Sequence, residues 1–257
     1  LCMLEKYYEH GESIGLEAPR AYYVPFARGQ KPSTRREDSH RFMSLNGIWK
    51  IHEYESVLEA DHFWENDPDS EISVPSCVQY AGLDHFQYTN TRYPFMFDPP
   101  RVPSINPAYH YTKTFTADDP ISVGDRTYIV FEGVDSCFYL YVNGRFVGFS
   151  QITHRSGEFD ITDYVHLGEN RLDVLVLKWC FGSYLEDQDK WRYTGIFRDV
   201  YLLFRPQYHI TDYKITTALQ NNTATVKFEN LGKIAALVRF EGKELPVEGG
   251  RSATFTV

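Results

Sequence analysis

Short strand-like runs separated by turn residues follow one another along most of this 257-residue sequence, and no long amphipathic helix interrupts them. The clearest signal is Asn143-Gly144, which stands between aromatic runs at residues 138–142 and 145–149. Asn and Gly both tolerate the positive φ of a type I′ turn, so this pair predicts a β-hairpin. Many short strands joined by turns predict an all-β chain whose main domain is a jelly-roll β-sandwich. Further runs lie at residues 47–52, 127–131, 171–177 and 196–204.

The pattern divides the chain into three parts. Residues 1–44 lack sustained periodicity, which predicts an extended amino-terminal arm. Residues 45–206 contain the strand runs of the jelly-roll domain. After Pro206 the pattern restarts, and short alternating runs continue through residues 207–257. Their close spacing predicts an immunoglobulin-like sandwich, of which this segment is only a part because a complete domain has about 100 residues.

A long stretch from about residue 76 to 117 is rich in Tyr, Pro and Asn and shows no clear strand pattern. Its aromatic content is too high for a disordered segment, so we expect an ordered loop region packed on the domain. Long ordered loops often carry function. Within this stretch, Asn90 offers a donor and an acceptor, which suits a sugar hydroxyl. It fits equally well as a turn former ahead of Pro94.

Composition limits the possible partners of the chain. With 26 basic and 35 acidic residues, a net charge of −9, it offers no basic field for nucleic acid. No apolar stretch is long enough to span a bilayer, and the first residues do not form a signal peptide. The cysteines show no metal-ligand spacing. We therefore expect a cytoplasmic protein that binds neither nucleic acid nor membrane and keeps four reduced thiols, at Cys2, Cys77, Cys137 and Cys180.

Three carboxylates, Glu186, Asp187 and Asp189, fall within four positions. They do not fit the acid and nucleophile of a retaining glycosidase, which face each other about 5–5.5 Å apart across the sugar and therefore need two rigid elements. Two interpretations remain. Arg192 and Arg198 can neutralise the charges in a paired loop network. Alternatively, one carboxylate reaches out to a ligand or to a hard cation such as sodium or magnesium.

A series of longer motifs occurs in a fixed order along the chain. The ordered set resembles the amino-terminal sugar-binding domain of large bacterial β-galactosidases in glycoside hydrolase family 2, over about residues 4–206. The remaining residues resemble the start of that family's first immunoglobulin-like domain. The motifs are Ser44-Leu45-Asn46-Gly47-x-Trp49-Lys50, Val74-Pro75-Ser76, Tyr88-Thr89-Asn90-x-x-Tyr93-Pro94-Phe95, Asp98-Pro99-Pro100-x-Val102-Pro103-x-x-Asn106-Pro107, Phe131-Glu132-Gly133-Val134-Asp135-Ser136, Val142-Asn143-Gly144-x-x-Val147-Gly148, Glu158-Phe159-Asp160 and the run 182–200.

The resemblance implies roles for two of the residues noted above. Enzymes of this family carry both catalytic glutamates and a magnesium site on a (β/α)₈ barrel far downstream, which this sequence does not contain. The jelly-roll domain lends loops to the edge of that site. Asn90 and Asp189 match the family's motif residues and are expected to form one wall of the galactose subsite. The resemblance also implies that Asp189 helps to bind a sodium ion that contacts the galactose 6-hydroxyl.

We therefore expect the non-catalytic portion of a β-galactosidase, inactive alone and holding neither sodium nor magnesium by itself. The parent enzyme is expected to be a homo-oligomer that hydrolyses terminal β-galactosides such as lactose with retention. The run from Glu186 to Asp189 favours a galactosidase over the β-glucuronidases and β-mannosidases of the same architecture. Departures from the family pattern at residues 76–79 and 153–156 lie outside Asn90 and Asp189 and concern loop packing.

Two alternatives stay open. The chain could be a free-standing carbohydrate-binding module that works as a jelly-roll lectin, which a complete second domain would favour. It could also be one subunit of a split β-galactosidase, with the barrel on a partner chain. A barrel encoded downstream in the same reading frame decides among the three.

Overall fold

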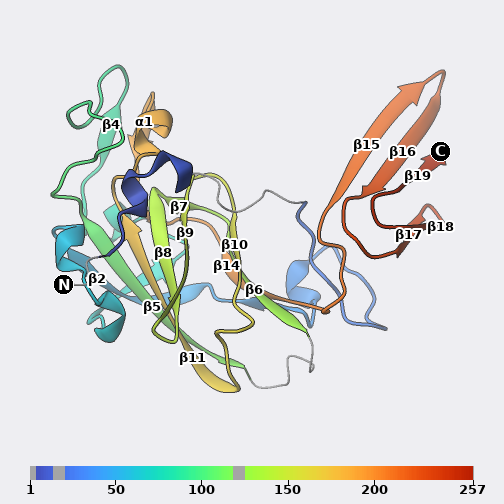
Figure 1. The fold of residues 1–257 in the computed structure, drawn as a ribbon, viewed down its shortest axis with the longest axis horizontal. Coiled ribbons are helices and arrows are strands. Elements are labelled where there is room, and N and C mark those ends of the chain that lie inside the picture. Colours follow the sequence, from blue (N-terminus) through green and yellow to red (C-terminus); the bar gives the residue numbers. More distant parts are fainter. Residues whose placement is uncertain (1–3, 14–20, 118–124, 257) are drawn as a thin grey trace. The chain divides into compact units, whose positions relative to one another are not determined.

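The computed structural model describes residues 4–13, 21–117 and 125–256. The chain forms two compact units (Figure 1). The first contains the described residues of Leu1–Glu17 and Pro25–Phe204, and the second those of Ala18–Val24 and Arg205–Val257. Part of the predicted amino-terminal arm, and Cys2 with it, lies outside the described residues.

Strands make up most of the first unit. They form a six-stranded sheet of order β3-β2-β5-β11-β8-β9 and a four-stranded sheet of order β1-β14-β6-β10. Two short ribbons add β12 paired with β4, and β13 paired with β7. The bounds are β1 Phe42–Ser44, β2 Gly47–Tyr54, β3 Ser70–Val74, β4 Gln87–Thr89, β5 Ala108–Ala117, β6 Arg126–Phe131, β7 Val134–Asp135, β8 Cys137–Val142, β9 Arg145–Gln151, β10 Gly157–Asp160, β11 Gly168–Leu177, β12 Lys190–Arg192, β13 Gly195–Ile196 and β14 Val200–Arg205.

Helical segments are short throughout the residues that the structure describes. The only α-helix among them is α1, Ser183–Glu186, which Figure 1 shows at the same end of the first unit as β4. The all-β prediction is therefore confirmed as a β-sandwich, whereas the jelly-roll connectivity stays a prediction. The 3-10 turns are η1 Tyr7–Glu9, η2 Gly11–Ser13, η3 Arg36–Asp38, η4 Val57–Glu59, η5 Phe63–Glu65 and η6 Val78–Ala81.

The six-stranded sheet is buried on both faces because successive side chains of a strand point to opposite sides. On β8, Phe138 and Leu140 belong to the core shared with the four-stranded sheet. Tyr139 and Tyr141 belong to a second core on the other face. Tyr8 from the amino-terminal segment is buried in this second core, and the Tyr139 hydroxyl donates to that segment's main chain at 2.6 Å. These residues of the predicted arm thus cover one face of the sandwich.

The predicted hairpin at Asn143-Gly144 is confirmed. Strands β8 and β9 pair antiparallel on either side of it, with Val142 opposite Arg145. The φ angles of Asn143 and Gly144 are 51° and 74°, as a type I′ turn requires. The Asn143 amide also donates to the Tyr164 carbonyl at 2.9 Å, so the turn is anchored to the rest of the unit.

The expected loop over residues 76–117 is wrong in its last ten residues, because they form β5. This strand lies between β2 and β11 and pairs with β11 from Ala108 opposite Leu177 to Ala117 opposite Gly168. Buried polar residues hide its period in the sequence: His110 is fully buried. The predicted run 196–204 is also interrupted, since β13 ends at residue 196 and β14 begins at residue 200.

The second unit contains two small sheets, of order β15-β16-β19 and β17-β18. Tyr23 belongs to this unit, and its hydroxyl donates to the Ile210 carbonyl at 2.7 Å. Strand β18 has no alternating apolar pattern in the sequence, because it contains Pro246 and charged residues. The immunoglobulin-like topology stays a prediction. The bounds are β15 Tyr213–Gln220, β16 Thr223–Asn230, β17 Ala236–Phe240, β18 Lys243–Val247 and β19 Ser252–Thr256.

Candidate functional site

The ribbon of β4 and β12 brings Asn90 and Asp189 together. Thr89 lies opposite Lys190 in this ribbon, so the residues that follow β4 and precede β12 lie at the same end. The Tyr88 hydroxyl donates to Asp189 Oδ1, and Asn90 Nδ2 donates to the Tyr88 oxygen at 3.3 Å. One phenol thus joins the two residues that are expected to contact galactose.

Both of these residues present polar atoms to solvent. Asn90 and Asp189 are exposed. Asp189 has a φ of 52°, a left-handed conformation that Asp adopts more readily than most residues. The hydrogen bond to Asp189 raises the pKa of Tyr88, so the phenol remains a donor at neutral pH. An exposed carboxylate beside an amide can accept from and donate to a polyol, or supply an oxygen ligand to a hard cation.

Arg192 forms a buried ion network behind the acidic loop. Its Nη1 donates to Asp135 Oδ1 at 2.5 Å, and its Nη2 lies 2.7 Å from Asp187 Oδ2. Burial opposes the charge of Arg192, but Asp135 and Asp187 outweigh it and raise the pKa of the guanidinium. Burial also raises the pKa of Asp187, against the effect of Arg192. Lys190 adds a contact of 3.3 Å from Nζ to Asp135 Oδ2.

The three carboxylates of the acidic loop therefore have different surroundings. Asp187 is buried and pairs with Arg192, as the loop-network interpretation predicted. Glu186 accepts hydrogen bonds from Thr153, at 3.1 Å from the main-chain N and 2.9 Å from Oγ1. Asp189 is exposed and directed to the ribbon end. One structure thus contains both a paired network and an outward carboxylate.

A pocket of about 350 Å³ lies beside this network, and no pattern in the sequence predicted it. Its lining combines aromatic rings with a carboxylate, an amine, an imidazole and a thiol. The usable signal was Trp191, an exposed aromatic residue between the charged Lys190 and Arg192 on β12. The lining residues are Cys77, Asp135, His154, Lys190, Trp191, Tyr193 and Phe197.

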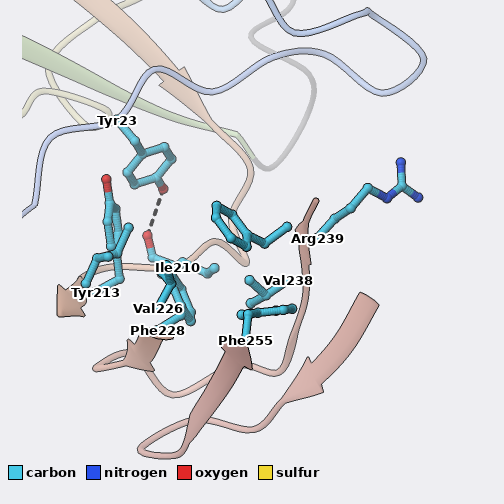
Figure 2. A pocket seen from close by; sticks show the side chains of 10 residues that line it. Tyr23, Ile210, Tyr213, Val226, Phe228, Val238, Arg239 and Phe255 are labelled. Carbon is cyan, nitrogen blue, oxygen red and sulfur yellow. Dashed lines mark hydrogen bonds between the residues drawn. The ribbon is translucent and has the colours of Figure 1, made fainter. Parts of the chain in front are cut away.

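The second unit contains a hollow of its own, of about 360 Å³ (Figure 2). Side chains of both small sheets line it, and nearly all are apolar. The Tyr23 hydroxyl is bonded to the Ile210 carbonyl, and Figure 2 shows Arg239 extending away from the other side chains. This hollow therefore lacks a set of polar groups for chemistry. Its lining is Tyr23, Ile210, Tyr213, Ile215, Val226, Phe228, Val238, Arg239, Phe240 and Phe255.

Neither a metal-ligand cluster nor an exposed thiol occurs in the part of the chain that the structure describes. No three His, Cys, Asp or Glu side chains gather there into a metal-binding group. Cys77, Cys137 and Cys180 are free thiols and buried. Burial raises the pKa of Cys77 to about 11, so it is a neutral thiol at pH 7. Within the same residues, no helix has the length and apolar character needed to cross a membrane.

Comparison with known proteins identifies the sequence relatives. The family described as "Glycosyl hydrolases family 2, sugar binding domain" matches residues 42–206. A β-galactosidase of Actinobacillus pleuropneumoniae is 46% identical over 217 residues, which are 82% of this chain and 21% of that protein. A β-galactosidase of Staphylococcus xylosus is 43% identical over 214 residues, again 82% of this chain and 21% of that protein. The chain thus spans about a fifth of the length of these relatives.

Solved structures with a similar fold are more distant in sequence. A β-glucuronidase from Ruminococcus gnavus in complex with D-glucaro-d-lactam has a TM-score of 0.63 at 18% identity, over 84% of this chain and 39% of that chain. An uncultured Clostridium sp. β-glucuronidase has a TM-score of 0.58 at 17% identity, over 83% of this chain and 39% of that chain. They support the fold alone. Since the family match covers most of the first unit, the chain belongs to glycosyl hydrolase family 2 and contains the family's sugar-binding domain.

Proposed function

We propose that this chain is the amino-terminal, non-catalytic portion of a β-galactosidase and forms one wall of its galactose subsite. The observation that carries this proposal is the contact of Asn90 and Asp189 through Tyr88 at an exposed ribbon end. Sequence relatives at 39–46% identity that are named β-galactosidases support the choice of galactosides over other glycosides.

Asn90 and Asp189 bind the substrate in this proposal and take no part in bond cleavage. The Asn90 amide offers a donor and an acceptor to sugar hydroxyls. Asp189 uses Oδ1 to accept from Tyr88, which leaves Oδ2 for a sodium ion shared with the galactose 6-hydroxyl. The catalytic glutamates and the magnesium ion belong to a downstream barrel, where the parent enzyme, a cytoplasmic homo-oligomer, hydrolyses terminal galactosides such as lactose with retention.

The second unit is, in the same proposal, part of an immunoglobulin-like domain that further polypeptide completes in the parent enzyme. Its open apolar hollow supports this, because apolar surface of that kind is normally covered. A free-standing carbohydrate-binding module is the second candidate, and the aromatic pocket beside Asp135 favours it. A split β-galactosidase with its barrel on a partner chain fits the same observations.

The galactose wall is tested by Asp189→Asn and Asn90→Ala in the parent enzyme. We expect each change to raise KM for a chromogenic β-galactoside about tenfold or more, since hydrogen bonds to charged or sugar-facing groups are lost. Asp189→Asn should also blunt the dependence of the rate on sodium, because an anionic ligand is removed. Asp163→Asn, an exposed carboxylate on the same unit, is the control.

An unchanged KM with an unchanged sodium response contradicts the assigned roles of these residues. In the 257-residue chain, Asp189→Asn should leave the melting temperature nearly unchanged, since exposed substitutions have small effects on stability. The chain alone should not hydrolyse a chromogenic β-galactoside, because both catalytic glutamates belong to the downstream barrel in this proposal. Turnover that follows the protein through purification is the opposite result.

A further inference from the structure

The pocket beside Arg192 has a polar floor that the galactose wall does not use. Asp135 is almost fully buried, with 2% of its surface exposed, and Oδ2 lies 3.3 Å from the Lys190 amine. Each carboxylate oxygen has two lone pairs, and an ammonium has three N–H donors. Among the described residues, Asp135 is the only hydrogen-bond partner of the Lys190 amine. The Lys190 amine can therefore still donate hydrogen bonds, and the neighbouring Asp135 carboxylate can still accept them.

Two oppositely charged side chains line the pocket. Lys190 carries one positive charge, and Asp135 carries one negative charge. An anionic ligand would meet Asp135, and a cationic ligand would meet Lys190, each at a cost from like-charge repulsion. Hydroxyl groups fit both partners, because one hydroxyl can accept from the amine and donate to the carboxylate. The floor thus selects neutral groups that donate and accept.

The walls of the pocket are aromatic. Trp191 has 52% of its surface exposed, and Tyr193 and Phe197 are half-buried. His154 lies edge-on to Phe197 at 5.4 Å between ring centroids. Aromatic faces of this kind pack against apolar C–H groups. A volume of about 350 Å³ lies at the lower end of the range for small-molecule sites.

We propose that this pocket binds a single neutral pyranose ring. Lys190 and Asp135 hydrogen-bond to its hydroxyls, while Trp191, Tyr193 and Phe197 pack against its C–H groups. A pyranose is the common biological molecule that combines neighbouring hydroxyls with apolar C–H faces in a small ring. The size of the pocket limits the ligand to a monosaccharide unit or to the end of a longer glycan.

The proposed site is a neighbour of the galactose wall and shares no residue with it. The Trp191 ring lies 5.6 Å from the ring of Tyr88, whose hydroxyl holds Asp189. Neither Asn90 nor Asp189 lines the pocket. Sugar binding in this pocket therefore does not depend on whether the parent protein is a galactosidase.

The test is a sugar titration of the 257-residue chain, followed by the NMR shift of the Trp191 indole N–H. This signal is identified with Trp191→Phe. The probes are methyl β-D-galactopyranoside and methyl β-D-glucopyranoside, with D-glucuronate as the anionic control. We expect a saturable shift with at least one neutral glycoside and a Kd at least about tenfold weaker for glucuronate.

Variants assign the binding to the pocket. Lys190→Met keeps the aliphatic stem and leaves Asp135 paired with Arg192, and it should weaken binding about tenfold or more. Tyr193→Ala should also weaken sugar binding, because an aromatic side chain that lines the pocket is lost. Asn90→Ala changes only the galactose wall and should leave Kd within about twofold. Thermal melts of all three variants establish that each is folded.

Three results overturn the proposal. The first is no saturable shift at any concentration of either neutral glycoside. The second is glucuronate binding as tightly as the neutral glycosides. The third is binding lost in Asn90→Ala but kept in Lys190→Met, which places the sugar at the ribbon end and leaves the galactose wall itself intact.

Discussion

Arg192 is the buried side chain on which the ion network of the first unit depends. Its guanidinium joins Asp135 on β7 to Asp187 after α1, and it lies 4.9 Å over the Trp179 ring. Two carboxylates at this depth require a cation between them, because an uncompensated buried charge costs several kcal/mol. The same network holds β12 in place. Trp191 lies on this strand and lines the pocket, and Asp189, which precedes the strand, is exposed to solvent.

Arg192→Met should therefore lower the free energy of unfolding of the first unit by about 3–5 kcal/mol, since it leaves the buried Asp187 without a cation and Asp135 with Lys190 alone. Urea titration followed by Trp fluorescence measures the change. Arg198→Met is the matched control, because Arg198 is exposed and lies over the Phe197 ring at 5.3 Å. That contact is worth about 1 kcal/mol or less. Equal losses in both variants would mean that the network has no special role.

His110 gives the first unit a defined response to acid. It is fully buried on β5, with Nε2 2.8 Å from Asp173 Oδ1. Burial lowers the pKa of His110, and Asp173 opposes this only in part. An unfolded chain, where the usual value is about 6.5, then binds the proton more readily than the folded chain. Stability is complete above that pH and falls as the pH drops from it toward the lower folded pKa.

The expected fall is at most about 1.4 kcal/mol per pH unit over this window. His110→Gln should remove it, so the difference in unfolding free energy between pH 7 and pH 5 becomes smaller than in the unchanged chain. His40→Gln is the control, because His40 is exposed. If His40→Gln flattens the pH profile as much as His110→Gln does, the buried imidazole is not the source.

At the residue scale, the family resemblance singled out Asn90 and Asp189, but not the contacts that hold them. Asn90 and Asp189 come from the sequence pattern, and the structure joins them through Tyr88. The role of Asp135 could not be predicted. It depends on β7, β12 and α1 meeting in space, and Asp135 and Arg192 are far apart in the sequence.

Among the elements, β13 is tightly packed against Tyr111 on β5 and the main chain of Ser76. Gly195 on β13 has a φ of 122°, and a Cβ there would lie 2.7 Å from Tyr111 Oη and 3.1 Å from the Ser76 carbonyl oxygen. Gly168 on β11 has a φ of 89°, with no atom within 4 Å of the position of a Cβ. Substitutions at these two glycines therefore separate the cost of backbone strain from the cost of steric crowding.

Gly168→Ala should lower the unfolding free energy by about 1 kcal/mol, through strain at positive φ alone. Gly195→Ala should lower it by a further 1–3 kcal/mol or so, because overpacking adds to the same strain. Urea titration of both variants measures the difference. Equal losses would indicate that Tyr111 moves aside freely.

The elements that the sequence predicted are those with local signals. The hairpin of β8 and β9 depends on Asn143-Gly144, and its apolar runs need no knowledge of the rest of the chain. Strand β5 was not predicted because it contains buried polar residues, His110 and Thr112, whose hydrogen-bond partner is Asp173 on the neighbouring strand. The alternation of apolar residues along the sequence does not reveal such a hydrogen-bonded pair. Strand β18 was not predicted either, because its side chains are mostly exposed and so do not alternate between apolar and polar residues.

For the whole molecule, the two units differ in how completely they bury their strands. All six residues of β8 are buried, whereas seven of the eight residues of β15 are exposed and the eighth is half-buried. Core side chains of the second unit are few: Val247, Ala253 and Phe255 form its buried cluster. The relatives of this chain are about five times longer than the stretch they share with it. The second unit therefore has surface that further polypeptide can cover.

Hydrogen exchange tests this difference. In the 257-residue chain, amides of β15, β16 and β19 should exchange faster than those of β8 and β11, because local opening is easier where few apolar contacts are broken. In a longer chain that continues through the next segment of the parent protein, protection of β15, β16 and β19 should rise. Protection of β8 and β11 should not change, since both faces of the six-stranded sheet are already buried. Unchanged exchange in the second unit would show that its hollow is covered by something other than the following segment.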